Sequence, residues 1–213
     1  MDTSATKWTG ARAAVGSRHF DLPARARRAS GFLDQLTTPI EGEETVVDVG
    51  AGSGFLTLAA AARVGRGRVI AIELSPDMLR RLEHRARRVG LADRIEAIQA
   101  DAAATGLESE SVDVVVSYAL LHELFDADAA IAEWVRVLAP GGTMLHRDVA
   151  HGWYSFIVRL LHDRRAHGPF ECEDLAALLE KNGLVDVEVT RDGKLLTAKA
   201  RKPATGSSAR ASS

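Results

Sequence analysis

The chain has 213 residues, enough for one substantial domain, and its 46% hydrophobic and 26% charged residues are ordinary for a globular protein. A formal net charge of -2 gives no overall basic field, so a nucleic-acid partner is not expected. Cys172 is the single cysteine, which excludes an intramolecular disulfide and favours a reducing compartment. The first residues lack the apolar core of a signal peptide, and no apolar run approaches the ~20 residues that cross a bilayer. We therefore expect no membrane association and a cytoplasmic location.

The N-terminal part precedes the main domain. Residues 1–18 are small and polar without a clear period, which fits either disorder or a flap that orders over a ligand. Residues 22–36 are typical of a helix with Pro23 near its first turn. We expect residues 1–40 to form an N-terminal flap and helical segment.

The central stretch of the chain runs from Thr45 to Gly54. Its valines predict a short strand that is buried on both faces of a parallel sheet. Gly50, Gly52 and Gly54 then allow the backbone to turn sharply and to approach a ligand closely. The apolar run 55–60 predicts a helix whose N-terminus points into the same turn. This order of strand, glycine turn and helix is typical of a nucleotide-cofactor site.

Further strands and helices alternate along the chain. Ser75, Pro76 and Asp77 predict a helix start, and Gly90 predicts its end. Its apolar face is expected to comprise Met78, Leu82, Ala86 and Val89. We expect its basic residues to form a solvated face: Arg80, Arg81, His84, Arg85, Arg87 and Arg88. Strands are predicted at 68–73, 94–101, 112–117 and 143–149, and Asp126 is expected to cap a helix that ends at Pro140-Gly141-Gly142.

The C-terminal part differs from this alternation. A helix is predicted at 173–181, followed by strands at 185–189 and 195–200 that an Asp-Gly turn joins as a hairpin. The predicted fold is therefore α/β: a doubly wound, mostly parallel seven-stranded sheet that ends in an antiparallel hairpin. We expect this domain to span residues 41–200 and the polar tail 201–213 to be disordered.

Carboxylates stand where several predicted strands end, the edge at which open parallel sheets bind ligands. Glu73 follows the glycine turn by about twenty residues, where an acid accepts from ribose hydroxyls. Asp101 ends the next strand and is suited to accept from an adenine amino group. A nicotinamide site typically has a third glycine where Phe55 stands, so the turn favours a cofactor without a pyrophosphate.

These motifs together resemble the class I S-adenosylmethionine-dependent methyltransferases of the small-molecule, UbiE-like type. The segments that carry the resemblance stand in the family's order, at 46–54, 71–79, 99–102, 111–117 and 138–142. The resemblance covers roughly residues 40–200 and implies a Rossmann-like methyltransferase fold with S-adenosylmethionine as the cofactor.

The resemblance also implies roles for individual residues. The glycine turn would hold the methionine part of the cofactor, through Asp48, Gly50, Ala51, Gly52 and Gly54. Glu73 would bind the ribose, and Leu74 and Met78 would enclose the adenine. Asp101 and the Ala102 backbone would lie at the adenine edge, and the Ser117 carbonyl would reach the cofactor's amino end.

Methyl transfer needs a general base only where the acceptor must lose a proton. His122, which follows the fourth strand, is the first candidate, and a histidine that merely shapes the pocket is an equal alternative. His146 and Asp148 at the fifth strand end are further candidates for a base or a substrate anchor. Together with His151 these two residues could also be metal ligands, but we disfavour this interpretation and expect no metal. Trp153, Tyr154 and Phe156 are suited to an apolar substrate wall or to a plain amphipathic helix.

The acceptor is not specified by these patterns. Ser117-Tyr118-Ala119-Leu120 stands where enzymes that methylate exocyclic base or amide nitrogens tend to carry Asn/Asp-Pro-Pro-Tyr. The compact chain resembles family members that act on small molecules, and a small-molecule substrate is the expectation. An RNA or protein acceptor, a cofactor-binding protein without turnover and, less favoured, a nicotinamide oxidoreductase remain alternatives.

Overall fold

The computed structural model describes residues 23–152 and 169–205. Its centre is one seven-stranded sheet with the strand order β3-β2-β1-β4-β5-β7-β6. The strands are β1 (Thr45–Val49), β2 (Arg68–Glu73), β3 (Ile95–Gln99), β4 (Val112–Tyr118), β5 (Leu138–Val149), β6 (Val185–Asp192) and β7 (Leu195–Arg201). The strands from β3 to β5 pair in parallel, and β7 pairs antiparallel with both β5 and β6. The mostly parallel sheet with an antiparallel hairpin is thus confirmed.

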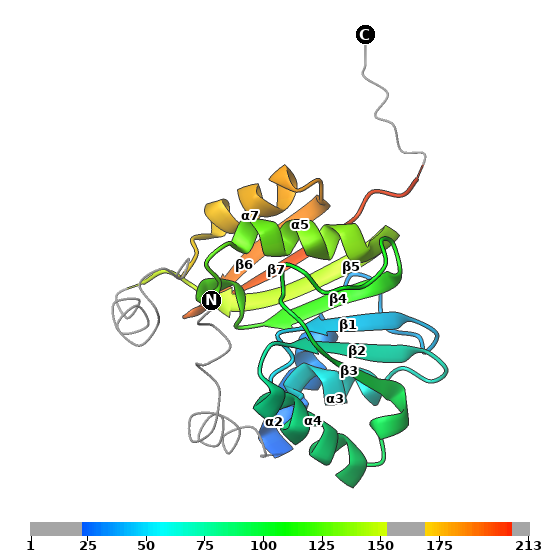
Figure 1. Cartoon of the computed structure of the whole chain (residues 1–213). Coiled ribbons are helices and arrows are strands. Elements are labelled where there is room, and N and C mark those ends of the chain that lie inside the picture. The colour runs from blue at the N-terminus through cyan, green and yellow to red at the C-terminus, as the bar shows by residue number, and fades with distance from the viewer. Residues whose placement is uncertain (1–22, 153–168, 206–213) are drawn as a thin grey trace.

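Helices cover both faces of this sheet (Figure 1). They are α2 (Pro23–Leu33), α3 (Phe55–Ala61), α4 (Pro76–Arg88), α5 (Ala127–Val137) and α7 (Cys172–Lys181), with the short 3-10 helices η2 (Ala92–Arg94) and η3 (Leu121–Glu123). Side chains of α5 and α7 pack in one core cluster with inward residues of β1, β4 and β7. Side chains of α2 and α3 pack on the opposite face in a second cluster. The two layers give the doubly wound arrangement.

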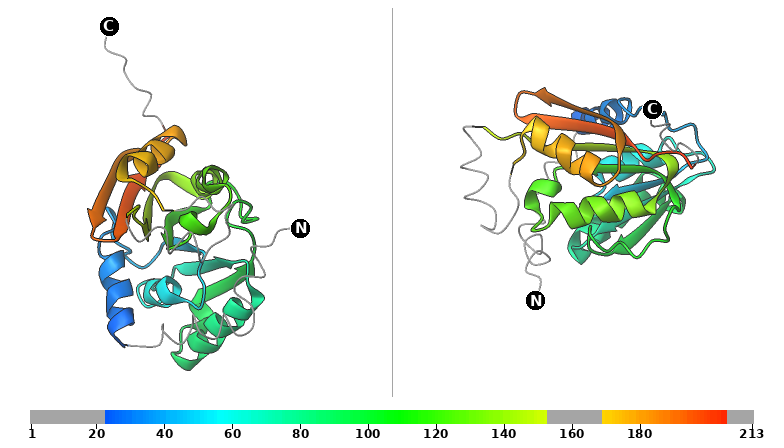
Figure 2. Two further views of the ribbon diagram at one scale, coloured as in Figure 1. Left: turned by 90° about the vertical axis from the view of Figure 1, so that its left-hand side faces the viewer. Right: turned by 90° about the horizontal axis from the view of Figure 1, so that it is seen from above.

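The parallel strands place their carboxyl ends along one edge of the sheet. In Figure 1 the arrow of β5 points to the left, and the left-hand view of Figure 2 faces this edge. The glycine turn after β1, Glu73 at the end of β2, Ser117 in β4 and Asp148 in β5 therefore share one side of the molecule. This edge is where the sequence predicts the ligand site.

Helix starts follow the predicted capping chemistry. The Ser75 hydroxyl accepts from the Met78 N–H at 3.4 Å, and Pro76 occupies the first turn of α4. The Asp126 carboxylate accepts from the Ala129 N–H at 2.9 Å and begins α5. Each cap satisfies a backbone donor that has no partner within its own helix.

Two details of the sequence prediction are wrong. Strand β5 begins at Leu138, before the Pro-Gly-Gly segment that was expected to separate helix and strand, and its pairing with β4 shifts register between Val112 and Val114. The irregular pairing accommodates Pro140, which cannot donate to a neighbouring strand. Val89, expected on the apolar face of α4, is 58% exposed because it lies beyond the last helical turn.

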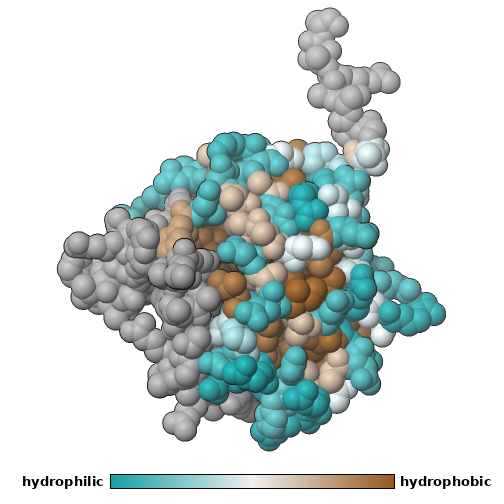
Figure 3. Space-filling model, viewed as in Figure 1, coloured by the Kyte–Doolittle hydropathy of each residue, from teal (hydrophilic) through white to brown (hydrophobic). Residues whose placement is uncertain are grey.

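The surface is mainly polar. On the face shown in Figure 3, polar side chains surround an apolar area near the middle. Among the described residues, none of the helices has both the length and the apolar character to span a membrane.

Candidate functional site

The glycine turn has the backbone conformation that its sequence predicts. Gly50, Gly52 and Gly54 all have positive φ, at 74°, 54° and 90°. A Cβ added at Gly50 would lie 2.9 Å from the end of the Leu120 side chain, which would have to shift to admit it. The Gly50 and Ala51 N–H groups both donate to the Ile72 carbonyl, at 2.9 and 3.0 Å. The turn is thereby fixed to the end of β2.

The Glu73 carboxylate connects the segment after β1 with the segment after β2. Its Oε2 accepts from the Gly52 N–H at 2.9 Å, and its Oε1 accepts from the Ser75 N–H at 2.9 Å. Burial raises the pKa of Glu73, the backbone hydrogen bonds from Ser75 and Gly52 lower it, and the nearby charge of Glu123 raises it again. The carboxylate is therefore held against the glycine turn with lone pairs left to accept further donors.

Asp48 lies beneath the same turn. It is 2% exposed, and its Oδ2 accepts from the Thr57 hydroxyl of α3 at 2.6 Å. Burial raises the pKa of Asp48 to about 7, against the opposing effect of the Thr57 hydrogen bond. Near neutral pH this carboxyl group therefore exchanges between its neutral and charged forms.

The predicted adenine contacts come from α4 and from the turn after β3. Met78 is buried in the first turn of α4, and Leu74, which precedes that helix, is half-buried. The Asp101 carboxylate accepts from the Ala103 N–H at 2.8 Å, and the Ala102 carbonyl accepts from the Trp134 indole at 3.1 Å. Asp101 and Ala102 thus form an ordered turn that α5 supports.

Three predicted catalytic residues meet in one buried cluster. The Asp148 carboxylate is fully buried between two imidazoles. Its Oδ1 bonds His122 Nδ1, and its Oδ2 lies 3.0 Å from His146 Nε2. Burial acts to raise the pKa of Asp148, but the hydrogen bonds from His122 and His146 bring it well below its usual range. Asp148 is therefore a carboxylate under ordinary conditions, and both imidazoles donate to it.

The cluster adjoins the glycine turn. Leu120, two residues before His122, places its side chain against Gly50, and Glu123, one residue after it, contributes to the electrostatics of Glu73. His122 Nε2 lies 3.8 Å from Glu123 Oε1, on the opposite side of the ring from Asp148. Nε2 of His122 therefore faces away from Asp148, on the side of Glu123.

The backbone between β4 and η3 is strained. Ala119 has φ +56°, a conformation that costs a residue with a Cβ roughly 1 kcal/mol or more. Its N–H donates to the Arg147 carbonyl of β5 at 2.7 Å, which holds this turn in place. Strain at the end of a central strand is typical of a functional site, and here it sets the path from Ser117 to His122.

Two residues that contribute to the site were not predicted. Arg85 was expected on the solvated face of α4, yet its guanidinium donates to the Ser53 carbonyl at 2.7 Å and so reaches the glycine turn. Trp134 was expected only as a core residue, yet it bonds Ala102 and packs edge-on against the His146 ring, with 5.7 Å between centroids. Helical spacing indicates which face such residues occupy and does not indicate what their polar atoms reach.

His151 does not join the cluster. Its Nδ1 pairs with Glu171 Oε1 at 3.0 Å, and both side chains are about half exposed. Within residues 23–152 and 169–205, no group of three or more His, Cys, Asp or Glu side chains has a geometry that could hold a metal ion. Trp153, Tyr154 and Phe156, suggested as a substrate wall, lie outside the described residues.

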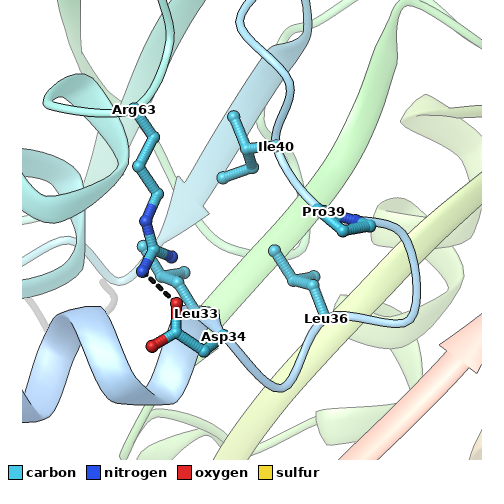
Figure 4. A pocket seen from close by; sticks show the side chains of 6 residues that line it. All are labelled: Leu33, Asp34, Leu36, Pro39, Ile40 and Arg63. Carbon is cyan, nitrogen blue, oxygen red and sulfur yellow. Dashed lines mark hydrogen bonds and ion pairs between the residues drawn. The ribbon is translucent and has the colours of Figure 1, made fainter.

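An open pocket of about 310 Å³ lies elsewhere (Figure 4). Leu33, Leu36, Pro39 and Ile40 line it before β1 begins, and Arg63 lines it before β2 begins. It therefore lies at the amino ends of these strands, opposite the glycine turn. Arg63 is already paired with Asp34 and with the Ser30 carbonyl, so the pocket offers no uncompensated charge to a ligand.

The chain matches the family model of a methyltransferase domain over residues 46–142. The chain is also similar to the ubiquinone/menaquinone biosynthesis C-methyltransferase UbiE of Escherichia coli O1:K1 / APEC, with 31% identity over 103 residues. That match covers 48% of this chain and 41% of the relative, so the chain corresponds to less than half of the relative's length.

Solved structures share the fold. Phosphoethanolamine N-methyltransferase 2 of Haemonchus contortus, in complex with S-adenosyl-L-methionine, matches with a TM-score of 0.79 at 18% identity, over 94% of this chain and 59% of that one. The [4+2]-cyclase SpnF matches with a TM-score of 0.69 at 19% identity, over 84% of this chain and 82% of that one. At such identities the likeness concerns the fold alone.

The family match begins in β1 and ends within β5, so it contains the glycine turn, Glu73, Asp101 and Ser117. The match to a methyltransferase domain and the similarity to UbiE thus confirm the resemblance to class I S-adenosylmethionine-dependent methyltransferases that the motifs indicate.

Proposed function

We propose that the protein is an S-adenosylmethionine-dependent methyltransferase that acts on a small-molecule acceptor by in-line displacement, with His122 as the general base. The observation that carries the proposal is the His122–Asp148 pair beside the glycine turn. A histidine bonded to a carboxylate beside the glycine turn combines a group that can take a proton with a turn that can position a methyl donor.

The described residues fit S-adenosylmethionine. Three glycines with positive φ leave alternate positions of the turn without side chains, so a ligand can approach the backbone there. Glu73 is held at that turn with lone pairs free for two ribose hydroxyls, and Leu74 and Met78 offer apolar contacts for the adenine. The remaining contacts in the proposal are Asp48, Ala51, Asp101, Ala102 and the Ser117 carbonyl. When bound, the cofactor supplies a methyl group on a sulfonium, which is a good leaving group.

His122 is suited to accept a proton. Because Asp148 is ionised, it fixes the proton of neutral His122 on Nδ1 and leaves a lone pair on Nε2. When Nε2 takes a proton from the acceptor, the resulting imidazolium is stabilised by the buried carboxylate. Such a base serves acceptors that must lose a proton as the methyl group arrives, namely hydroxyl, phenol or enol groups and acidic C–H groups.

A small-molecule acceptor is supported by the relatives. The curated relative is named as a C-methyltransferase of ubiquinone and menaquinone biosynthesis, and a structural neighbour is named as a phosphoethanolamine N-methyltransferase. The base in this chain favours the first kind of chemistry over the second, because an amine can attack before it loses its proton.

The test is release of S-adenosylhomocysteine from S-adenosylmethionine with a panel of phenolic, enolic, hydroxy and amino compounds. We expect turnover with a phenolic or enolic compound, and a loss of roughly 10²-fold or more in kcat for His122→Gln. His84→Gln, which removes an exposed histidine from α4, is the matched control and is expected to retain full activity.

Other outcomes separate the alternatives. Turnover restricted to amines, with unchanged activity in His122→Gln, would contradict the role of His122. The protein could bind S-adenosylmethionine and turn over RNA or protein but none of the small molecules. That result would mean that the acceptor is a macromolecule and would contradict a small-molecule acceptor. Binding without turnover on any acceptor would indicate a regulatory protein.

A further inference from the structure

The buried cluster holds two imidazoles on one carboxylate, and the proposed base chemistry uses only one of them. His146 lies on β5 two residues before Asp148 and is fully buried. It neighbours Ser117 across the pairing of β4 with β5, and its ring packs against Trp134. It therefore has no access to a substrate, and any effect it has on the reaction must pass through Asp148.

Asp148 accepts from four N–H groups. Two come from the imidazoles of His122 and His146. Two come from the backbone, from the His122 N–H at 3.1 Å and from the Val149 N–H at 2.6 Å. Each carboxylate oxygen thus has one imidazole and one backbone donor, which uses the roughly four acceptor sites of the group and leaves it no freedom to rotate.

The other nitrogen of His146 decides its protonation state. No described group bonds His146 Nδ1, and none bonds the Ser117 hydroxyl, although both atoms are buried. A proton on Nδ1 would create a buried cationic N–H without an acceptor, which is much more costly than an unused lone pair. His146 is therefore neutral, with its single proton on Nε2 and directed to Asp148.

We propose that His146 is a positioning residue: as a neutral Nε2–H imidazole it holds Asp148 in the orientation that keeps the proton of His122 on Nδ1 and its lone pair on Nε2. The proposal deepens the function proposed above and rests on it for the role of His122. His146 supplies a hydrogen bond without a charge, so the cluster keeps one negative charge until His122 is protonated. Glu123 also faces His122, on the side of Nε2.

A hydrogen-bond donor of the same reach should therefore replace His146. The amide nitrogen of a glutamine lies at about the same distance from the backbone as imidazole Nε2, and it donates without ever carrying a charge. His146→Gln is expected to keep the arrangement, whereas His146→Leu removes the donor and leaves Asp148 free to turn or to take up a proton. A residue that itself transferred protons would tolerate neither change.

The experiment is long-range ¹H–¹⁵N correlation spectroscopy of the histidine side chains in the full chain, without an acceptor. We expect the wild type to show His122 with its proton on Nδ1 and His146 with its proton on Nε2. His146→Gln should keep the His122 tautomer, and His146→Leu should replace it by averaged or reversed nitrogen shifts. His84→Gln serves for assignment and as the matched control.

A His146 proton on Nδ1 in the wild type would overturn the proposal, and so would an unchanged His122 tautomer in His146→Leu. If His146→Leu does not fold, the wild-type spectrum still tests the proposal, because it shows which nitrogen of His122 and of His146 carries the proton. With an acceptor in hand, kcat near neutral pH should fall roughly tenfold or more in His146→Leu and be restored in His146→Gln. Because the spectra need no turnover, a failure of the proposed methyl transfer would leave this test intact.

Discussion

Two buried aspartates at the same edge of the sheet have opposite protonation behaviour. Asp148 accepts hydrogen bonds from the imidazoles of His122 and His146, and these outweigh the effect of burial, so its pKa is lowered. Asp48 has the Thr57 hydroxyl as its side-chain partner, and burial raises its pKa to about 7. The difference lies in their partners, two imidazoles for Asp148 and a hydroxyl for Asp48, since both side chains are almost fully buried.

The two aspartates affect the stability of the fold in opposite directions as the pH changes. The lowered pKa of Asp148 contributes stability that is present above pH ~4 and is lost as the pH falls through its folded-state pKa. The raised pKa of Asp48 acts in the other direction. Between its ordinary pKa of 3.8 and about 7 the folded state holds a proton that the unfolded state has released, so stability falls as the pH rises through this window.

Replacement of Asp48 tests this account. Asp48→Asn keeps an oxygen for the Thr57 hydroxyl and removes the buried charge, so the variant should gain stability relative to the wild type as the pH rises from 5 to 8. The relative gain should be about 2 to 3 kcal/mol, since one pKa unit corresponds to ~1.4 kcal/mol. Urea unfolding at both pH values measures it, and a difference that does not change with pH would contradict the raised pKa.

The glycine turn is the element on which the proposed cofactor site depends. Gly50→Ala forces a Cβ into contact with Leu120 and places it at φ +74°, so it should destabilise the fold by roughly 2 to 4 kcal/mol, combining backbone strain with overpacking. Gly90→Ala is the matched control: its φ is +70°, and no atom lies within 4 Å of the added Cβ. It should cost only the strain of roughly 1 to 2 kcal/mol.

Denaturant unfolding of the two variants compares these costs. Equal losses would mean that Leu120 moves aside, and the contact between η3 and the glycine turn would then not be fixed. A larger loss of unfolding free energy in Gly50→Ala than in Gly90→Ala would support a fixed contact between Leu120 of the histidine cluster's segment and the glycine turn.

Helix α4 joins the two halves of the proposed cofactor site. Met78 at its start is the proposed adenine contact, and Arg85 near its end donates to the Ser53 carbonyl of the glycine turn. Arg85→Met should therefore weaken S-adenosylhomocysteine binding by roughly 5- to 30-fold, as expected for the loss of one charge-assisted hydrogen bond of about 1 to 2 kcal/mol.

Calorimetric titration of S-adenosylhomocysteine against Arg85→Met measures this effect, and Arg85→Lys should restore part of the affinity. Arg88→Met, on the exposed face of the same helix, is the control and should bind as the wild type does. Equal affinities of Arg85→Met and the wild type would show that the contact with Ser53 does not position the turn.

Elements with strong local signals were predictable from the sequence. The Ser75-Pro76 start of α4, the Asp126 cap of α5 and the Asp-Gly hairpin lie within one or two residues of their predicted positions. The start of β5 was not predictable, because Pro140 and two glycines locally favour a turn while the pairing with β4 keeps them in an irregular strand. Long-range pairing outweighed local preference there.

At the scale of the whole molecule, the sheet brings residues that are distant in sequence to one edge. Predicted strand ends were sufficient to place the glycine turn, Glu73 and Asp148 on the same side. They were not sufficient to predict that His122 and His146 share one carboxylate, because that depends on side-chain directions in β5 and η3. The contacts of Arg85 and Trp134 were likewise beyond sequence patterns, since they depend on how far each side chain reaches.

The central claim is that the edge formed by the glycine turn and Glu73 binds S-adenosylmethionine. Titration calorimetry with S-adenosylhomocysteine on the wild type, Glu73→Gln and Glu83→Gln tests it most directly, since Glu83 is an exposed glutamate of α4 and serves as the control. We expect binding to the wild type and to Glu83→Gln, and an affinity at least roughly tenfold lower for Glu73→Gln, which loses a charged acceptor. Absence of binding to the wild type, or equal affinity in all three proteins, would contradict the account.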